Sequence, residues 1–264
     1  MSRMEEPVRT RAEGDTATTG GPRARYREHT RAEIKQIALR QLAEGGVTAI
    51  ALTRIAKELE LSGPALYRYF AGRDDLLGTL IGDAYQELAT AIAEASEASA
   101  TDTRRDRLLS LAGSHRAWAL RQPHRYLLIA GSPLPGYTAP PETLAHARAA
   151  LGPFLTVFAS ARPVPAVLPV VEQMTEWARR DPAVADWTAR YLDSPDAPDA
   201  LKAADSPDAA DRPGRALAGA VMAWTRLHGV VSLEVEGHYD GMGHQPELLL
   251  DVEMNTLADT FRLG

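Results

Sequence analysis

Apolar residues recur at helical spacing along most of this chain. In residues 31–44 they fall three or four positions apart, and the pair Gly45 and Gly46 ends the pattern. Residues 52–59 repeat that spacing, and no convincing strand-like alternation is found, so the pattern predicts an all-α fold. Further helices are expected at 63–70, 73–98, 103–121, 124–130, 142–160, 165–180, 183–192, 214–236 and 247–262.

Composition divides the chain into three regions. Residues 1–26 are rich in Gly, Thr, Pro and mixed charge without an apolar run, which predicts a disordered N-terminal arm and not a secretory signal. Residues 27–75 hold short helices and are expected to form a head, and residues 76–264 are expected to form a helical-bundle body. Within the body, segment 193–213 is rich in Asp, Pro, Ala and Ser, which predicts a mobile loop.

Charge is unevenly distributed between these regions. The net charge is −6, yet residues 23–75 hold ten Lys/Arg and seven Asp/Glu. A basic head on an acidic body is typical of a local nucleic-acid-binding module. Cysteine is absent, which excludes disulfides and thiolate metal sites and fits a cytoplasmic protein. No uninterrupted apolar stretch approaches the roughly 20 residues of a membrane helix, so no membrane partner is expected.

Two short helices in the head, 52–59 and 63–70, are joined by a tight turn that ends at Ser62. Ala56 is small where the helices must cross closely, and Ser62 followed by Pro64 is a signal for a helix start. The outer face of the second helix is polar. This arrangement predicts a helix-turn-helix whose second helix enters the major groove of DNA.

The stretch from Arg31 to Leu80 resembles the head of the TetR/AcrR family of transcription regulators. The motifs are an Ile-Ala pair, a turn ending in Ser, a helix ending in Leu-Tyr-x-x-Phe, a basic residue and an acidic-Leu helix start. Here they are Ile55-Ala56, Ser62, Leu66-Tyr67-Arg68-Tyr69-Phe70, Arg73 and Asp75-Leu76. The resemblance implies a three-helix DNA-binding head joined to a helical-bundle body that binds a ligand and dimerises.

The resemblance also implies individual DNA contacts. Arg68 is expected to make a bidentate contact to guanine, a geometry that Arg suits. The two tyrosines of the motif are expected to bind phosphates, although Tyr67 could be a plain surface aromatic and Arg31 part of a solvated basic face. The full set expected at DNA is Arg31, Thr53, Arg54, Ser62, Gly63, Pro64, Ala65, Tyr67, Arg68, Tyr69 and Arg73.

One position departs from the family pattern. Ala51 stands where the family usually has Thr, so a phosphate-binding cap is missing before the second helix. Either Thr48 or Thr53 must compensate, or DNA affinity falls.

The resemblance places the dimer surface on the last long helices of the body. Helix 214–236 is the candidate because its small residues allow close helix approach, although it could equally be a central core helix. The residues expected at the homodimer interface are Ala216, Leu217, Gly219, Ala220, Trp224 and Leu227. The string Trp224-x-x-Leu227-His228-Gly229 is similar to the Trp-His-Gly signature of one TetR subfamily.

A pocket for a small-molecule effector would be lined mostly by apolar and aromatic side chains. The candidates are His115, Trp118, Tyr126, Phe154, Phe158, Met174, Trp177 and Met222, each of which could instead be plain core.

The sequence thus predicts a regulator, by family habit a repressor. It is expected to bind a palindromic double-stranded operator as a homodimer, to be released by the effector, and to need no cofactor. A non-sensing architectural DNA-binding protein is the first alternative. The second is a metal-dependent enzyme that uses the loop containing His238, Asp240 and His244, but no nucleophile elbow, P-loop or dinucleotide fingerprint appears.

Overall fold

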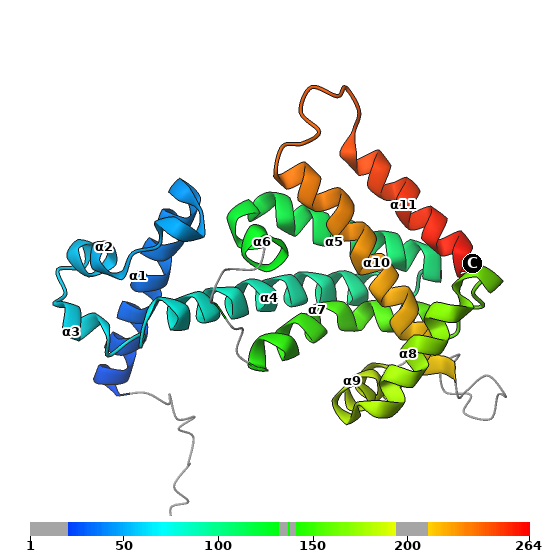
Figure 1. The fold of residues 1–264 in the computed structure, drawn as a ribbon, viewed down its shortest axis with the longest axis horizontal. Helices are drawn as coiled ribbons and strands as arrows, with labels where there is room; N and C mark the ends of the chain where they lie inside the picture. Colours follow the sequence, from blue (N-terminus) through cyan, green and yellow to red (C-terminus); the bar gives the residue numbers. More distant parts are fainter. Residues whose placement is uncertain (1–20, 132–136, 138–140, 194–210) are drawn as a thin grey trace, which may run out of the picture.

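The computed structural model describes residues 21–131, 137, 141–193 and 211–264, which form helices and no strand (Figure 1). The all-α prediction is therefore confirmed. The head contains α1 (Pro22–Gly45), the short 3₁₀ helix η1 (Val47–Ala49), α2 (Leu52–Glu58) and α3 (Gly63–Leu66). The body contains α4 (Arg73–Ala98), α5 (Arg104–Arg121), α6 (Pro123–Ala130), α7 (Pro141–Phe158), the 3₁₀ helix η2 (Pro165–Val167), α8 (Leu168–Arg180), α9 (Pro182–Leu192), α10 (Arg212–Val235) and α11 (Pro246–Thr260).

Helix boundaries differ from the expected ones in two ways: α3, expected at 63–70, ends at Leu66, and some helices begin earlier than expected, at or next to a proline. Helix α1 begins at Pro22, so residues 22–26 of the expected arm are helical. Helix α10 begins at Arg212, so the end of the expected loop 193–213 is also helical. The rest of the expected arm (1–20) and residues 194–210 of that loop lie outside the described residues.

Two separate apolar cores hold the molecule together, and α4 contributes to both. Near its start, Leu76, Leu77 and Leu80 pack in the core of the head. Further along, Leu88 and Ile92 pack in the core of the body. Figure 1 shows α4 running from the head to the opposite end of the body. Helix α4 is therefore a rod that connects the two regions mechanically.

Helix α10 lies at the centre of the body. A Cβ atom on its Gly219 would lie 2.1 Å from the ring of Phe158 on α7, so only glycine allows the two helices to approach this closely. By length and composition α10 would also pass for a membrane span, but half of its most apolar window is buried in the body. Its apolar composition is that of a core helix.

Candidate nucleic-acid interface and ligand site

The turn between α2 and α3 is set by backbone geometry. Glu60 adopts a left-handed conformation with φ 54°, and the N–H of Leu61 donates to the carbonyl of Ala56 at 2.9 Å. This closes α2 in the manner of a Schellman turn and redirects the chain into α3. Leu66 and Phe70 are each 1% exposed and face the core of the head. The opposite face of α3 is left to solvent.

That exposed face carries most of the residues expected at DNA. Tyr67 is 57% exposed, and Arg68 is exposed with no partner among the described residues. Ser62 occupies the N-cap of α3, but its side chain makes no capping hydrogen bond, contrary to the expected capping role. A Cβ on Gly63 would meet nothing within 4 Å. We use the name α3 face for six residues at this surface: Thr53 on α2, together with Ser62, Gly63, Pro64, Tyr67 and Arg68 in and beside α3.

Two arginines expected at DNA are engaged inside the head. Arg31 donates to the carbonyl of Tyr69 at 2.7 Å, and its guanidinium lies 4.2 Å from the ring centre of Phe70. Arg73 donates to the carbonyls of Val47 and Ile50, at 2.7 and 3.2 Å. These contacts stabilise the head, because buried backbone carbonyls require donors. The expected roles of Arg31 and Arg73 at DNA stay predictions.

The remaining residues expected at DNA, Arg54, Ala65 and Tyr69, are either paired with another side chain or half-buried. Arg54 is exposed and forms an ion pair with Glu44 at 3.0 Å, which a phosphate could replace because exposed pairs are weak. Tyr69 is half-buried against the core of the head, and Ala65 is half-buried on α3. These residues therefore lie at the edge of the α3 face.

Ala51, the N-cap residue of α2, receives no side-chain capping hydrogen bond, but its backbone N–H has a partner that the sequence did not indicate. The side-chain oxygen of Gln41, which is 2% exposed, accepts from the N–H of Ala51 at 2.9 Å. Thr48 donates to the carbonyl of Gly45, and Thr53 remains exposed. Gln41 lies on α1, so no local motif could have revealed this long-range contact.

In the body, the fold gathers five aromatic and histidine side chains from α5, α6 and α10 into one cluster. The ring centroids of His115 lie 5.8 Å from Tyr126, 5.6 Å from Trp224 and 6.1 Å from His228. Trp118 joins the cluster at 6.4 Å from Tyr126. We call these five residues the His115 cluster. It unites three residues that were expected at a ligand with His228, which belongs to the sequence motif, and Trp224, which belongs to that motif and was expected at the dimer interface.

Several polar atoms of this cluster lack a protein partner. Both ring nitrogens of His115 and the indole N–H of Trp118 are buried without a hydrogen bond among the described residues. The Tyr126 hydroxyl, in contrast, lies 3.1 Å from Nδ1 of His228 and 3.0 Å from the Ser232 hydroxyl. Unpartnered buried polar atoms cost free energy, and each requires an explanation such as a bound ligand or water.

Burial also sets the charge of the cluster. Desolvation, with the nearby His228, lowers the pKa of His115 to about 3, and desolvation lowers the pKa of His228 to about 4. Burial raises the pKa of Tyr126 to about 12. All three side chains are therefore neutral near pH 7. The cluster offers hydrogen-bond donors and acceptors without net charge.

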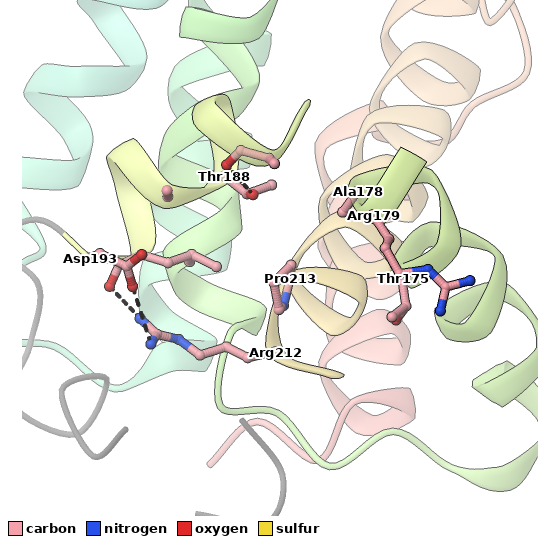
Figure 2. Close-up of a pocket in the computed structure, with 10 residues that line it drawn as sticks. Thr175, Ala178, Arg179, Thr188, Asp193, Arg212 and Pro213 are labelled. Carbon is pink, nitrogen blue, oxygen red and sulfur yellow. Dashed lines mark hydrogen bonds and ion pairs between the residues drawn. The ribbon is translucent and has the colours of Figure 1, made fainter. Parts of the chain in front are cut away.

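The other residues expected at a ligand lie elsewhere. Phe154 and Phe158 are fully buried, and Phe158 packs on Phe261 with ring centroids 4.9 Å apart, so both are core residues. Met174 and Met222 pack half-buried against the body core, and Trp177 is 38% exposed on α8. A cavity of about 370 Å³ between α8, α9 and the start of α10 contains none of the expected residues (Figure 2).

The expected dimer residues are used within the chain, which corrects that assignment. Ala216, Leu217, Ala220 and Leu227 have no exposed surface, and Gly219 packs against Phe158. Trp224 belongs to the His115 cluster. Small residues do allow close approach along α10, but the approaching helices belong to the same chain. The exposed apolar residues of α10 and α11 are Leu233, Leu248 and Val252.

The histidine-rich loop shows no metal-binding geometry. His238 pairs with Glu236 at 3.1 Å, and His244 packs against the ring of Tyr239. Within the described ranges, no group of three or more His, Asp or Glu side chains is placed to hold a metal ion.

Comparison with known families agrees with the geometry of both regions. The family model described as "Bacterial regulatory proteins, tetR family" matches residues 36–80, which contain the α3 face. The model described as "Tetracyclin repressor-like, C-terminal domain" matches residues 108–257, which contain the His115 cluster. The chain belongs to the TetR family. Membership makes it a transcriptional regulator with a helix-turn-helix DNA-binding domain, and not an enzyme.

Individual relatives of this TetR protein support the same conclusion. The HTH-type transcriptional regulator Rv1816 of Mycobacterium tuberculosis is 37% identical over 141 residues, which are 53% of this chain and 60% of that relative. The crystal structure of SCO4313, described as a regulatory protein, covers 90% of this chain and 100% of its own at 36% identity and a TM-score of 0.67. A protein of unknown function from Rhodococcus sp. RHA1, at 19% identity and a TM-score of 0.55, shares the fold. The Trp-His-Gly subfamily stays a prediction.

Proposed function

We propose that this TetR protein is a cytoplasmic repressor that binds a palindromic operator as a homodimer and is released by a small, uncharged effector. The observation that carries the proposal is the α3 face, whose polar side chains are exposed and have no role in packing. A surface of this kind is what a recognition helix presents to the major groove.

On DNA, the start of α3 lies in the major groove, and different side chains contact bases and phosphates. Arg68 contacts guanine, since its guanidinium has no partner among the described residues and matches the two acceptors of that base. Ser62 and Tyr67 donate to phosphates, and Gly63 allows the backbone to approach the duplex. Arg54 exchanges Glu44 for a phosphate.

The homodimer forms through the outer surface of α10 and α11. Leu248 and Val252 are 61% and 54% exposed, and Leu233 is 40% exposed. A Cβ on Gly229 of α10 would meet nothing within 4 Å, so this part of the helix is open to a partner. Covering these apolar side chains is favourable. Two heads about 34–36 Å apart then match successive major grooves of one duplex face.

The effector enters the His115 cluster. Its polar groups satisfy the ring nitrogens of His115 and the indole N–H of Trp118, which have no hydrogen-bond partner in the part of the chain that the structure describes. Because the cluster is neutral, a ligand without formal charge is favoured over an ion.

Release follows from the position of α6 between the cluster and the head. Tyr126 of α6 belongs to the cluster, while Leu128 on the same helix packs against the core of the head. Tyr85 of the connecting rod α4 donates to the carbonyl of Ile129 at 3.5 Å. An effector that repositions Tyr126 therefore moves α6 and α4, and the spacing of the two heads changes with them.

The test is selection of genomic fragments by the purified protein, followed by footprinting of the selected site. The proposal predicts one palindromic site, protected on one face of the duplex, with affinity that falls steeply as salt increases. Binding without sequence preference would instead identify an architectural DNA-binding protein. The gene beside the site gives a first set of effectors, and release from DNA by one of them is expected to disappear in Tyr126→Phe together with His228→Leu.

A further inference from the structure

Residues of the α4–α5 turn, the end of α7 and the C-terminal residues line a second groove, which lies at the end of α4 opposite the head. It encloses about 740 Å³ and is lined by four arginines, Arg104, Arg107, Arg162 and Arg262. Asp102 is the one acidic side chain among the lining residues. None of the four arginines forms an ion pair with a described acidic side chain, whereas the neighbouring Arg105 and Arg116 both do.

Arg107 is the most unusual of the four because it is buried. Its residue is 8% exposed, Nη2 donates to the Thr156 hydroxyl at 3.2 Å, and Nε is buried without a partner among the described residues. Burial lowers the pKa of Arg107, and the charge of Asp102 raises it. A buried guanidinium remains charged, so it requires an anion and a hydrogen-bond acceptor to offset the cost of desolvation.

Hydrogen bonds join the three segments of the chain that carry the other arginines. Arg104 donates to the Ser160 hydroxyl at 2.9 Å, which ties the start of α5 to the residues after α7. Arg162 donates its backbone N–H to the carbonyl of Phe261 at 3.2 Å.

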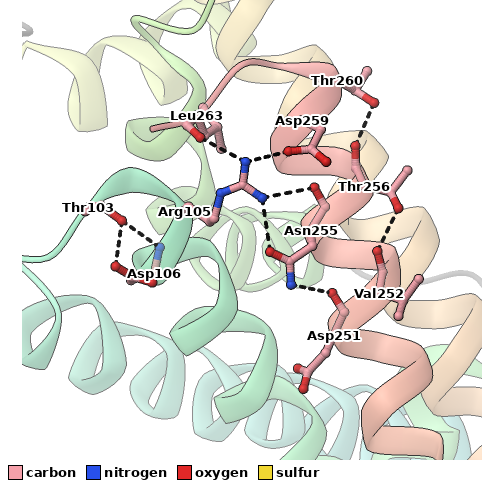
Figure 3. Close-up of polar contacts among 10 residues, drawn as sticks. All are labelled: Thr103, Arg105, Asp106, Asp251, Val252, Asn255, Thr256, Asp259, Thr260 and Leu263. Carbon is pink, nitrogen blue, oxygen red and sulfur yellow. Dashed lines mark hydrogen bonds and ion pairs between the residues drawn. The ribbon is translucent and has the colours of Figure 1, made fainter.

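Arg105 fixes the C-terminal segment that carries Arg262. Figure 3 shows its guanidinium bound to Asn255 and Asp259 of α11 and to the carbonyl of Leu263, at 3.1, 2.5 and 3.3 Å. Hydrogen bonds therefore hold the segments that carry the groove together, while the side chains of Arg162 and Arg262 are exposed at its surface.

We propose that this groove binds a small phosphorylated molecule. The planar guanidinium fork matches phosphate oxygens, and several forks on one groove suit a group with more than one negative charge. The volume lies within the range of small-molecule sites and exceeds what one inorganic phosphate needs. Asp102 on the rim would accept a hydrogen bond from a hydroxyl on the same ligand. This site is distinct from the neutral His115 cluster.

The test is calorimetric titration of the full-length protein, without DNA, with inorganic pyrophosphate and separately with citrate at fixed ionic strength. We expect one pyrophosphate per chain. The variant carrying Arg104→Gln and Arg262→Gln is expected to bind it at least about tenfold more weakly, because charge-assisted hydrogen bonds are lost. This variant keeps the buried Arg107, so its fold is expected to be intact by circular dichroism.

The matched control is Arg121→Gln, which removes an exposed charge from the opposite end of α5 and is expected to leave binding unchanged. If pyrophosphate binding were weakened equally in the control and the double variant, the effect would come from overall charge, and the proposed site would be wrong. Absence of pyrophosphate binding in the wild type, or binding of citrate only, would overturn the proposal. Since no DNA is present, these outcomes are independent of whether the protein represses transcription.

Discussion

The head and the body differ in where their candidate binding groups lie. In the head, the packed side of α3 is apolar, and the side chains of Tyr67 and Arg68 are exposed, although Nε2 of Gln41 is also buried there without a partner among the described residues. In the body, His115, Trp118 and Arg107 are buried with polar atoms that no described residue satisfies. A surface that reads a large, rigid duplex can stay exposed, whereas a site for a small molecule must enclose it. This difference explains why the candidate DNA contacts of the head lie on its surface, whereas the candidate ligand contacts of the body lie in its interior.

The largest expected effect concerns the dimer, because each head reads only half of a palindrome. The double change Leu248→Glu and Val252→Glu places charges on the exposed apolar surface of α10 and α11. We expect a monomer by light scattering and at least about a hundredfold loss of operator affinity, since two half-sites are no longer joined. Leu144→Glu on α7, where the leucine is 55% exposed, is the matched control. A dimer that survives the double change would place the interface elsewhere.

The next effect distinguishes packing inside the body from packing between chains. Gly219→Ala forces a methyl group into the ring of Phe158 and is expected to lower the free energy of unfolding by about 1–3 kcal/mol. Gly113→Ala on α5, where a Cβ meets nothing within 4 Å, is expected to be neutral or stabilising by up to about 1 kcal/mol. Urea denaturation of each variant measures both values. Equal stabilities would show that α7 and α10 can separate without loss.

A third prediction concerns the bracing arginines of the head. Arg73→Ala removes two hydrogen bonds to the carbonyls of Val47 and Ile50 and is expected to destabilise the head by about 1–3 kcal/mol. Thermal unfolding of the variant, compared with Arg68→Ala, measures this. An unchanged melting temperature in Arg73→Ala, with weaker binding to every DNA sequence, would show that Arg73 binds a phosphate of DNA and does not stabilise the head.

The smallest expected effect is a dependence of folding stability on pH that arises from two histidines of the body, His115 and His228. The folded-state pKa values of His115 (about 3) and His228 (about 4) lie below the ordinary 6.5, so the unfolded chain binds protons first as the pH falls. Stability from these groups is therefore present above pH 6.5 and is lost as the pH falls toward 4. His115→Phe is expected to reduce the slope of stability against pH by about 1.4 kcal/mol per pH unit between about pH 5.5 and 4. A slope equal to that of the wild type would mean that His115 is solvated.

Sequence reasoning succeeded where local pattern determines structure. Helix α4 has the bounds Arg73–Ala98 that its periodicity predicted, and Leu66 and Phe70 face the core as their spacing required. It failed where long-range contacts decide. Gln41 on α1 accepts the N–H of Ala51, and Arg31 and Arg73 donate to carbonyls that are distant in sequence. Small residues on α10 indicated close packing but could not indicate whether the neighbour was a second chain or α7.

The body illustrates the same limit for ligand sites. Trp and Met at helical spacing fit both core and pocket, so Phe158 and Tyr126 could not be separated by sequence alone. Only the fold shows that Tyr126 meets His115 and His228, whereas Phe158 meets Phe261. The sequence pattern did not indicate the groove lined by Arg104, Arg107, Arg162 and Arg262, because these arginines come from segments far apart in the chain.

The central claim is that the α3 face reads DNA sequence, and operator selection with Arg68→Ala tests it most directly. The variant is expected to fold normally, to lose about 1–3 kcal/mol of operator affinity, and to lose base preference at one position of each half-site. Arg121→Ala, an exposed arginine of the body, serves as the control. An Arg68→Ala protein that selects the wild-type site with unchanged preference at every base would contradict the account.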